Sequence, residues 1–230
     1  WGSVRSKPQR NAYHRFTVDR HLWEAAANAA RHIDRVGRPD LLVLGALMHD
    51  LGKGYPGDHT DVGMELVREI GPRLGLNSSD VDILVLMVEH HLLLADVAMR
   101  RDLTDSATIK SVADAVGSTE VLDLLWALTE ADSQATGPSA WGSWKAGLVN
   151  ELVERVRHVL GGGDVEEVAW SLFPDAEVLS LMAAGDLHLE LKDDLITVVN
   201  RDAAGTFSQV AGVLSLHGLD VVSARAHSDE

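Results

Sequence analysis

The stretch ALMHDLGKG, residues 46–54, joins a long apolar run to an adjacent histidine and aspartate. The run follows Pro39–Asp40, and its near-continuous apolarity predicts a buried central helix that stops at Gly52. An unpaired carboxylate at the end of such a helix is costly to bury, so the pair His49–Asp50 indicates a bound cation. For His49 alone, a core histidine with a satisfied hydrogen bond stays open as the alternative.

The composition limits the classes of protein that this chain can represent. Its 230 residues and 46% hydrophobic content predict one full domain and a smaller second one. The net charge of −15 argues against broad attraction to nucleic acid or to an anionic membrane. The sequence has no cysteine, so a metal must be held by imidazole and carboxylate groups. We find neither a signal peptide nor a membrane-spanning apolar run, and we expect a cytoplasmic protein.

Helical periodicity covers most of the first 160 residues. Thr17 or Asp19 can cap the first helix, and the polar starts Asn77–Ser78–Ser79 and Asp105–Ser106 introduce later ones. The sequence therefore predicts a mainly α bundle. Its expected helices span about 17–36, 39–52, 59–74, 79–96, 106–116, 119–134, 142–160 and, after the run GGGD, 165–184.

The periodicity changes after residue 185. LHLEL at 187–191 alternates and LITVVN at 195–200 is β-branched and apolar, so both predict strands. An amphipathic helix over about 205–217 and a further strand over 219–226 complete the tail. This partial α+β unit needs more strands or a partner to bury its sheet. Together with the start at Trp1, it leads us to expect a fragment of a longer chain.

Five of the eleven histidines form a pattern with two aspartates in the helical part of the chain. Imidazole and carboxylate together suit manganese, iron, zinc or, less well, magnesium. Two such ions about 3.5–4 Å apart can activate a water molecule and stabilise the entering and leaving oxygens at phosphorus. The residues are His21, His49–Asp50, His59, His90–His91 and Asp132.

Each member of this set has a plainer structural interpretation when it is taken alone. His90–His91 can cap the polar side of a helix, and His59 can be a surface residue at a helix start. His21 can be an ordinary first-turn residue, and Asp132 needs a cation or a cap if it is buried. The whole set in order is harder to explain as coincidence than any one member. We therefore predict that these side chains converge on shared ions.

The ordered pattern of His21, His49–Asp50 and Asp132 resembles the HD-domain phosphohydrolase superfamily. The resemblance extends to the family of bifunctional PII uridylyltransferase/uridylyl-removing enzymes and spans nearly the whole chain. It implies an HD-type helical bundle that hydrolyses a nucleotidyl group from the PII nitrogen-signalling protein, and C-terminal ACT domains that sense glutamine. The similar segments are NAYHRFTVDRH (11–21), HDLGKGYPGDH (49–59), VEHHLL (88–93), TEADSQATGPSAWGSWKAGL (129–148) and the tail at 195–228.

The resemblance also implies a role for each matching residue. A first metal would be held by His21, His49, Asp50 and Asp132, and a second by His59, His90 and His91, with Asp50 as the bridge. We expect Asp50, Lys53 and Lys145 to take part in catalysis, the lysines by binding a non-bridging phosphoryl oxygen. Two alternatives stay open. Lys53 can cap a helix C-terminus, and Lys145 can belong to a surface turn packed by tryptophans.

The segment after residue 195 resembles the opening of an ACT domain, a ferredoxin-like fold. The turn from Asp202 to Gly205 is the effector-binding candidate, although Ala204 replaces the usual proline. Only about half of an ACT unit is present, so simple α+β packing without an effector site stays open. The incomplete sheet edge predicts a homodimer through 187–230.

These inferences combine into one expected function. The chain would be a metal-dependent hydrolase that removes UMP, or AMP in some relatives, from a PII tyrosine under glutamine control. The alternatives are hydrolysis of a free nucleotide or cyclic dinucleotide, and a catalytically silent module that senses an amino acid. No P-loop spacing is present, and Asp80–Val81–Asp82 is typical of a helix start, so we expect no nucleotidyl transfer from this chain alone. The expected domains are an HD domain at 1–163, a helical connector at 164–186 and part of an ACT domain at 187–230.

Overall fold

The computed structural model divides into two compact units, Trp1–Val168 and Ala169–Glu230, which are described separately. The first unit is helical, and the second combines helices with one small sheet, so the predicted mainly α class is confirmed. The structure describes residues 1–9, 13–164, 174, 176–192, 195–201, 203–219, 221, 224 and 226–228.

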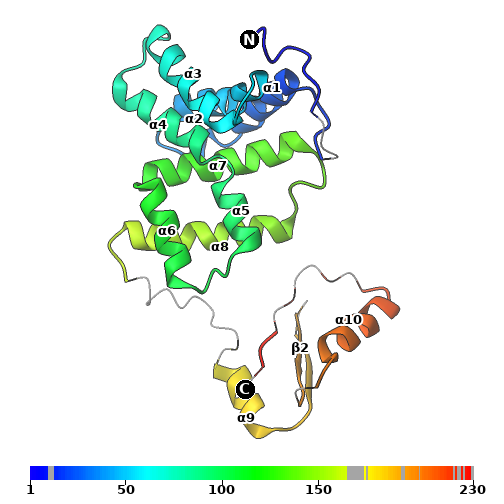
Figure 1. Ribbon diagram of the computed structural model, residues 1–230. Helices are drawn as coiled ribbons and strands as arrows, with labels where there is room; N and C mark the ends of the chain where they lie inside the picture. The colour runs from blue at the N-terminus through cyan, green and yellow to red at the C-terminus, as the bar shows by residue number, and fades with distance from the viewer. Residues whose placement is uncertain are drawn as a thin grey trace. The chain divides into compact units, whose positions relative to one another are not determined.

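The central helix α2 lies within the first unit and packs against α1, α4 and α7 (Figure 1). Its buried leucines, Leu41 and Leu42, join a core to which all the larger helices of the unit contribute. The elements are α1 (Val18–Ala29), η1 (Ile33–Arg35), α2 (Pro39–Met48), η2 (Leu51–Gly54), α3 (His59–Arg73), α4 (Ser78–Glu89), α5 (Leu93–Arg100), α6 (Ser106–Val116), α7 (Thr119–Thr136) and α8 (Ser143–Leu160).

Local capping explains why several helices begin where the sequence predicts. The Asp58 carboxylate accepts hydrogen bonds from the backbone N–H groups at the start of α3, and Asn77 does the same for α4. Asp105 and Ser118 cap α6 and α7 in the same way. Thr17 occupies the N-cap position of α1 but makes no capping bond through its side chain.

Two predicted helix ends are wrong. The first helix ends at Ala29, before 36, and the chain then turns through η1, where Arg35 pairs with Glu130 of α7 at 2.6 Å. The central helix ends at Met48 rather than at Gly52, and η2 follows it. In both places tertiary contacts after the helix end outweigh the helical pattern of the sequence.

The predicted single helix over 79–96 is two helices, α4 and α5, separated at residues 90–92. His91 is buried at this break, and its Nδ1 lies 2.7 Å from the carbonyl oxygen of Val88, one of the last carbonyls of α4. The imidazole of His91 therefore bonds to a carbonyl oxygen that would accept a backbone N–H if the helix continued. At this break the His91 ring lies beside the ring of His49, at the end of α2.

Gly52 holds η2 directly against the start of α3. A Cβ atom at this position would lie 1.8 Å from the carbonyl oxygen of His59, so only glycine permits the approach. This contact sets the position of the first residue of α3 relative to the end of α2.

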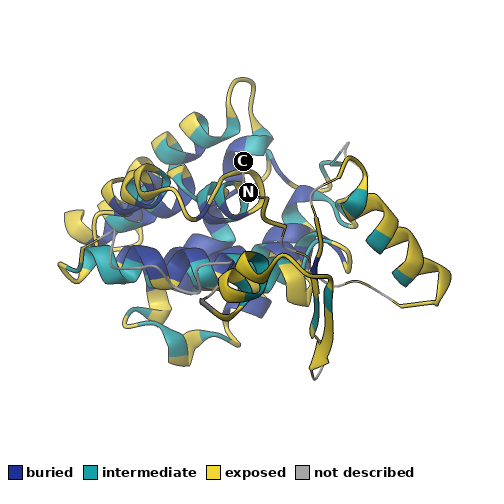
Figure 2. Cartoon of the chain, turned by 90° about the horizontal axis from the view of Figure 1, so that it is seen from below, coloured by how far each residue is buried: buried dark blue, intermediate teal, exposed yellow. Residues whose placement is uncertain are grey.

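The second unit contains α9 (Ala176–Ala184), β1 (His188–Lys192), β2 (Leu195–Val199) and α10 (Thr206–Leu216). The two strands pair antiparallel, with His188 opposite Val199, and confirm the predicted hairpin. The unit is largely exposed (Figure 2), including Leu189 and Leu191 on alternate positions of β1. Gly205 has φ +88° at the N-cap of α10.

Some predictions fall partly or wholly outside the described residues. They concern Asp202, most of the helix expected at 165–184 before α9, and much of the strand expected at 219–226. Among the described helices, none combines the length and the apolarity needed to cross a membrane.

Candidate metal centre

Three of the predicted ligands converge where α1, α2 and α7 meet. His21 on α1 and Asp132 on α7 approach to 2.9 Å between Nε2 and Oδ1, and His49, at the C-cap of α2, has its Nε2 3.4 Å from the same oxygen. The Nε2 atoms of His21 and His49 lie only 3.3 Å apart. Two ring nitrogens that face one point in this way need a proton or a cation between them.

A second group of predicted ligands lies on the other side of Asp50. His59, the first residue of α3, and His91, after α4, place their Nε2 atoms 3.9 Å and 3.8 Å from Asp50 Oδ1. The ligand atoms of these three residues all lie within 4.8 Å of one another, as do those of His21, His49 and Asp132. Both groups therefore have the dimensions of a site for one cation.

Asp50 connects the two groups because each of its carboxylate oxygens faces a different one. Oδ2 lies 3.4 Å from His49 Nε2 and 3.6 Å from His21 Nε2, while Oδ1 faces His59 and His91. The side chain is almost fully buried, and Oδ1 has no hydrogen-bond partner among the described residues. A buried carboxylate oxygen without a donor is unfavourable, and a bound cation would satisfy it. The donor set thus fits divalent metal.

Backbone contacts fix the orientation of two of the imidazole rings. His49 Nδ1 lies 2.9 Å from the carbonyl oxygen of Ala46, and His91 Nδ1 lies 2.7 Å from that of Val88. Because a carbonyl can only accept, Nδ1 donates in both rings, and Nε2 is the nitrogen left to bind a metal once it carries no proton. Both Nε2 atoms lie near Asp50.

Two buried carboxylates, Asp50 and Asp132, dominate the pKa values of the groups in the centre. Burial lowers the pKa of His49, but the carboxylates of Asp50 and Asp132 outweigh it and raise that pKa to about 10. Burial raises the pKa values of both carboxyl groups, yet His49 and other cationic neighbours hold them well below their usual range. Burial and the nearby His49 lower the pKa of His91. The centre therefore attracts positive charge, from protons or from a metal.

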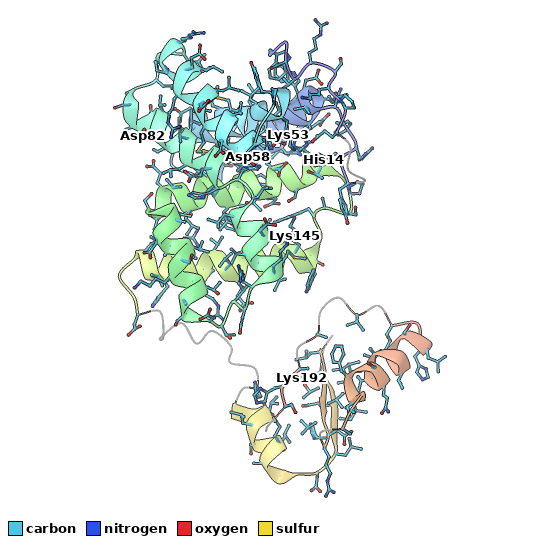
Figure 3. The ribbon with its side chains drawn as sticks, viewed as in Figure 1. His14, Lys53, Asp58, Asp82, Lys145 and Lys192 are labelled. Atoms are coloured by element: carbon cyan, nitrogen blue, oxygen red, sulfur yellow. The ribbon has the colours of Figure 1, made fainter. Side chains whose placement is uncertain are left out.

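The two lysines predicted to assist catalysis have different surroundings. Lys53 Nζ lies 2.5 Å from Asp50 Oδ2 and donates to Gln9 Oε1 at 3.1 Å, so it stands directly beside the centre. Lys145 donates to Ser133 Oγ and to the carbonyl oxygen of Ala140, both at 3.1 Å. Burial lowers the pKa of Lys145, while the charge of Asp132 raises it. Figure 3 labels both lysines on the first unit.

The structure adds one histidine that the sequence pattern misses and leaves one outside the described ligand groups. His14 forms a group of metal-ligand dimensions with His21 and Asp50, and its ring centroid lies 5.2 Å from that of His21 (Figure 3). Burial and the charge of Lys53 lower its pKa to about 4. His90 belongs to none of the groups found among the described residues, and its role as a ligand stays a prediction.

His14 precedes the first helix, so helical periodicity gives no signal for it. The only sequence signal available was its place in NAYHRFTVDRH, the segment that ends in His21. The resemblance to HD proteins predicts His90 as a ligand beside His91, but neighbouring residues diverge by about 100° around a helix and do not by themselves face one point.

Comparison with known families agrees with this geometry. Residues 18–118 match the family model of the HD domain, and the matched stretch contains His21, the His49–Asp50 pair and His91. The first unit therefore carries an HD domain over residues 18–118. HD domains bind divalent metals, which agrees with the histidine and aspartate groups around Asp50.

Curated relatives place the chain more narrowly. It is 53% identical over 177 residues to a bifunctional uridylyltransferase/uridylyl-removing enzyme of Streptomyces coelicolor, which covers 77% of this chain and 21% of the relative. The enzyme of that name from Mycobacterium tuberculosis is 45% identical over 97% of this chain and 28% of its own length. One from Gluconobacter oxydans is 32% identical over 99% of this chain and 31% of its own length. The chain thus spans between about a fifth and a third of these relatives.

Proposed function

We propose that this chain is a phosphodiester hydrolase that removes a nucleotidyl group, UMP or in some relatives AMP, from a tyrosine of the PII signalling protein. The observation that carries the proposal is the position of Asp50, with one oxygen toward His21 and His49 and the other toward His59 and His91. Such a shared carboxylate suits two adjacent divalent ions and a phosphoryl substrate. The uridylyl-removing activity named for the relatives supplies the substrate class.

The proposed ligands divide between two ions. His21, His49 and Asp132 would hold the first, His59 and His91 the second, and Asp50 both. Ions bound there would supply Lewis acidity to a phosphoryl oxygen and lower the pKa of a water molecule from about 15.7 toward about 7. The mixed imidazole and carboxylate donors suit manganese, iron or zinc, and magnesium less well.

The protein's own cations would complete the phosphoryl site. Lys53 Nζ stands 2.5 Å from the shared carboxylate, so its charge would fall beside a non-bridging oxygen of a phosphate at the centre. Lys145 would lie on the Asp132 side, where Ser133 and Ala140 fix its ammonium group. Both would position the substrate and spread the charge that develops on it.

The regulatory part of the proposal rests on the second unit. We propose that it is part of an ACT domain that responds to glutamine, with the turn from Asp202 to Gly205 at the effector site and a homodimer formed through 187–230. The hairpin of β1 and β2 followed by α10, and the left-handed Gly205 before that helix, support this proposal. The corresponding domain division is 1–163, 164–186 and 187–230.

The experiment that tests the hydrolase compares His49→Ala/Asp50→Ala with the unaltered chain on uridylylated PII. We expect the double variant to release no UMP while its circular dichroism is largely retained. A matched control, His217→Ala/Asp82→Ala, removes an exposed histidine and an exposed aspartate and should keep full activity.

The same assay separates the alternative functions. Adenylylated PII, a cyclic dinucleotide and free nucleotides are presented beside uridylylated PII. Turnover that persists in the His49→Ala/Asp50→Ala variant would defeat the site assignment. Faster turnover of a free or cyclic nucleotide would defeat the proposed substrate, and a metal-free, inactive chain that binds glutamine would identify a silent sensor.

A further inference from the structure

The first part of the sequence is basic, although the chain as a whole is acidic. Residues 1–23 carry five arginine and lysine side chains and one aspartate, whereas the net charge of all 230 residues is −15. A protein with this net charge repels other acidic molecules over most of its surface. The basic segment departs from that rule and can attract an acidic partner.

Two cations and two aromatic side chains of this segment form a continuous strip along one side of α1. The guanidinium groups of Arg15 and Arg20 each lie 5.5 Å from the centre of the Phe16 ring. Trp23 follows Arg20 by three residues and therefore lies on the same side of the helix. We call Arg15, Phe16, Arg20 and Trp23 the α1 strip.

The α1 strip is open to solvent at its two helical positions. The Arg20 side chain is 62% exposed, and Trp23 is 57% exposed. Glu24 accepts hydrogen bonds from Arg20 and offsets part of its charge, whereas Arg15 makes no ion pair among the described residues. Arginine and tryptophan are enriched among the residues that carry most of the energy of protein–protein binding. The strip therefore has the composition of a protein-docking surface.

Packing fixes the tryptophan of the strip before any partner binds. The Trp1 ring lies edge-on to the Trp23 ring, with 5.4 Å between the ring centres. A side chain that is already held in place loses little conformational entropy when a partner docks on it. Trp23 is thus prepared to act as an apolar anchor between the cations.

The strip leads to the metal centre at its Arg15 end. The backbone N–H of Arg15 donates to the Thr136 carbonyl at 3.1 Å, so the chain before α1 passes the end of α7 (Figure 1). The preceding residue, His14, forms a group of metal-ligand dimensions with His21 and Asp50. A protein that is bound along the strip therefore has its neighbouring residues beside the centre.

We propose that the α1 strip docks an acidic surface of the protein that carries the nucleotidyl group. The inference rests on the proposed function and deepens it, because it names the surface that holds this protein while its modified tyrosine enters the centre. Arg15 and Arg20 attract carboxylates of the partner, and Trp23 supplies apolar contact area. Nucleic acid is the less favoured occupant, because a long polyanion extends beyond the strip and meets the charge of the acidic chain.

The test uses the full 230-residue chain loaded with Mn²⁺. Calorimetry measures the binding of unmodified PII, the product of the proposed reaction, and steady-state assays give KM and kcat for uridylylated PII. We expect Arg15→Glu/Arg20→Glu to weaken binding and raise KM by about tenfold or more, with kcat nearly unchanged. Trp23→Ala should do so by about fivefold or more. Added salt should raise the KM of the unaltered chain more than that of the double variant.

Two controls separate docking from damage to the fold or to the centre. Arg68→Glu/Lys110→Glu makes the same change in net charge at exposed positions of α3 and α6, and it should leave PII binding and KM unchanged. The p-nitrophenyl ester of UMP needs the centre but no docked protein. Every strip variant should therefore hydrolyse this ester as the unaltered chain does.

Each of four results would overturn the inference. They are PII binding and KM that the strip variants leave unchanged, equal losses in Arg68→Glu/Lys110→Glu, loss of turnover of the small ester in the strip variants, and a strip that binds a single-stranded oligonucleotide but not PII. Failure of the proposed function is distinguishable, because it would leave PII binding dependent on the α1 strip in a chain that does not hydrolyse uridylylated PII.

Discussion

Asp50 is the residue on which the centre depends. It is buried at the end of an apolar helix, where a lone carboxylate would be costly, and two imidazole pairs and one lysine surround it. Its two carboxylate oxygens face different histidine groups, so Asp50 can bind two cations. Each histidine of these groups can bind only one of them. The backbone carbonyls that accept from Nδ1 of His49 and His91 keep the Nε2 atoms of both rings directed toward that carboxylate.

The adjacent histidines after α4 provide a matched test of the second group. We predict that His91→Gln weakens the binding of one Mn²⁺ ion by more than the roughly 10–100-fold typical of losing an outer contact to a metal ligand. His90→Gln should leave both ions bound, since His90 is in none of the described groups. Calorimetric titration with Mn²⁺ measures both variants. Equal losses in the two would contradict the distinction drawn between these residues.

Metal binding should release protons. The carboxylates beside His49 raise its pKa to about 10 in the folded chain, above the usual 6.5, so this imidazole is protonated at pH 8 without metal. A metal needs the lone pair that the proton occupies, and we expect about one proton to leave His49 as Mn²⁺ binds at pH 8. Calorimetry in two buffers of different ionisation enthalpy gives this number directly.

The sign of the pH dependence follows from the same shift. A raised pKa means that protonated His49 stabilises the metal-free fold below pH 6.5, and that this contribution is lost as the pH rises through about 10. Mn²⁺ affinity should therefore increase with pH over that interval. Affinity that is flat from pH 7 to 9, with no proton released, would contradict the proposed state of His49.

The short element η2 sets the distance between the two ligand groups. It follows His49–Asp50 immediately and packs on the first turn of α3, where His59 lies. Gly52 permits this approach because its missing side chain leaves room for the His59 carbonyl. The break between α4 and α5 has a similar effect on His91. The centre is thus assembled by helix ends, where backbone carbonyls and caps direct side chains inward.

Gly52→Ala tests the role of this packing. The new Cβ would meet backbone atoms of His59 at 1.8 Å and 2.7 Å, which cannot move as a flexible side chain could. We expect a loss of about 1–3 kcal/mol in the free energy of unfolding, measured by urea denaturation, together with weaker Mn²⁺ binding.

Gly147→Ala is the control for this substitution. Gly147 lies exposed within α8 with no atom close to its would-be Cβ, so alanine there should stabilise by about 0.5–1 kcal/mol. Destabilisation of similar size in both variants would show that the contact with His59 is not the cause.

For the molecule as a whole, helix caps were predictable from the sequence, and the tertiary contacts that end or divide helices were not. The caps at Asp58, Asn77 and Asp105 fixed helix starts that the sequence alone revealed, because capping bonds join residues two or three apart. The break before α5 was missed, since VLMVEHHLLL reads as one apolar helix and only the buried place of His91 shows otherwise.

Most of the ligands were predictable from the sequence, and two residues near the centre were not. The pattern of histidines and aspartates predicts most of the set, and the structure brings together His21, His49, Asp50, His59, His91 and Asp132. His14 and Gln9 lie before the first helix, where no periodicity marks them, and their nearness to the centre depends on tertiary contacts such as the one between Gln9 and Lys53.

Metal should control the stability of the first unit. The described groups concentrate buried carboxylates and imidazoles that a cation would satisfy, and a ligand that binds only the folded state stabilises it by about 2.7 kcal/mol at a hundred times its Kd. We therefore predict that EDTA lowers the Tm of the helical unit and that Mn²⁺ restores it, in scanning calorimetry. In the His49→Ala/Asp50→Ala variant the Tm should not respond to Mn²⁺. A Tm unaffected by EDTA in the metal-loaded chain would contradict a structural contribution from the centre.

Anomalous diffraction at the manganese edge, from crystals grown with Mn²⁺, tests most directly whether Asp50 joins two metal sites. We predict two peaks, one within bonding distance of His21, His49 and Asp132 and the other of His59 and His91, with an Asp50 oxygen bonded to each. A map without a peak at Asp50, or with one ion that leaves His59 and His91 without a metal, would contradict the account.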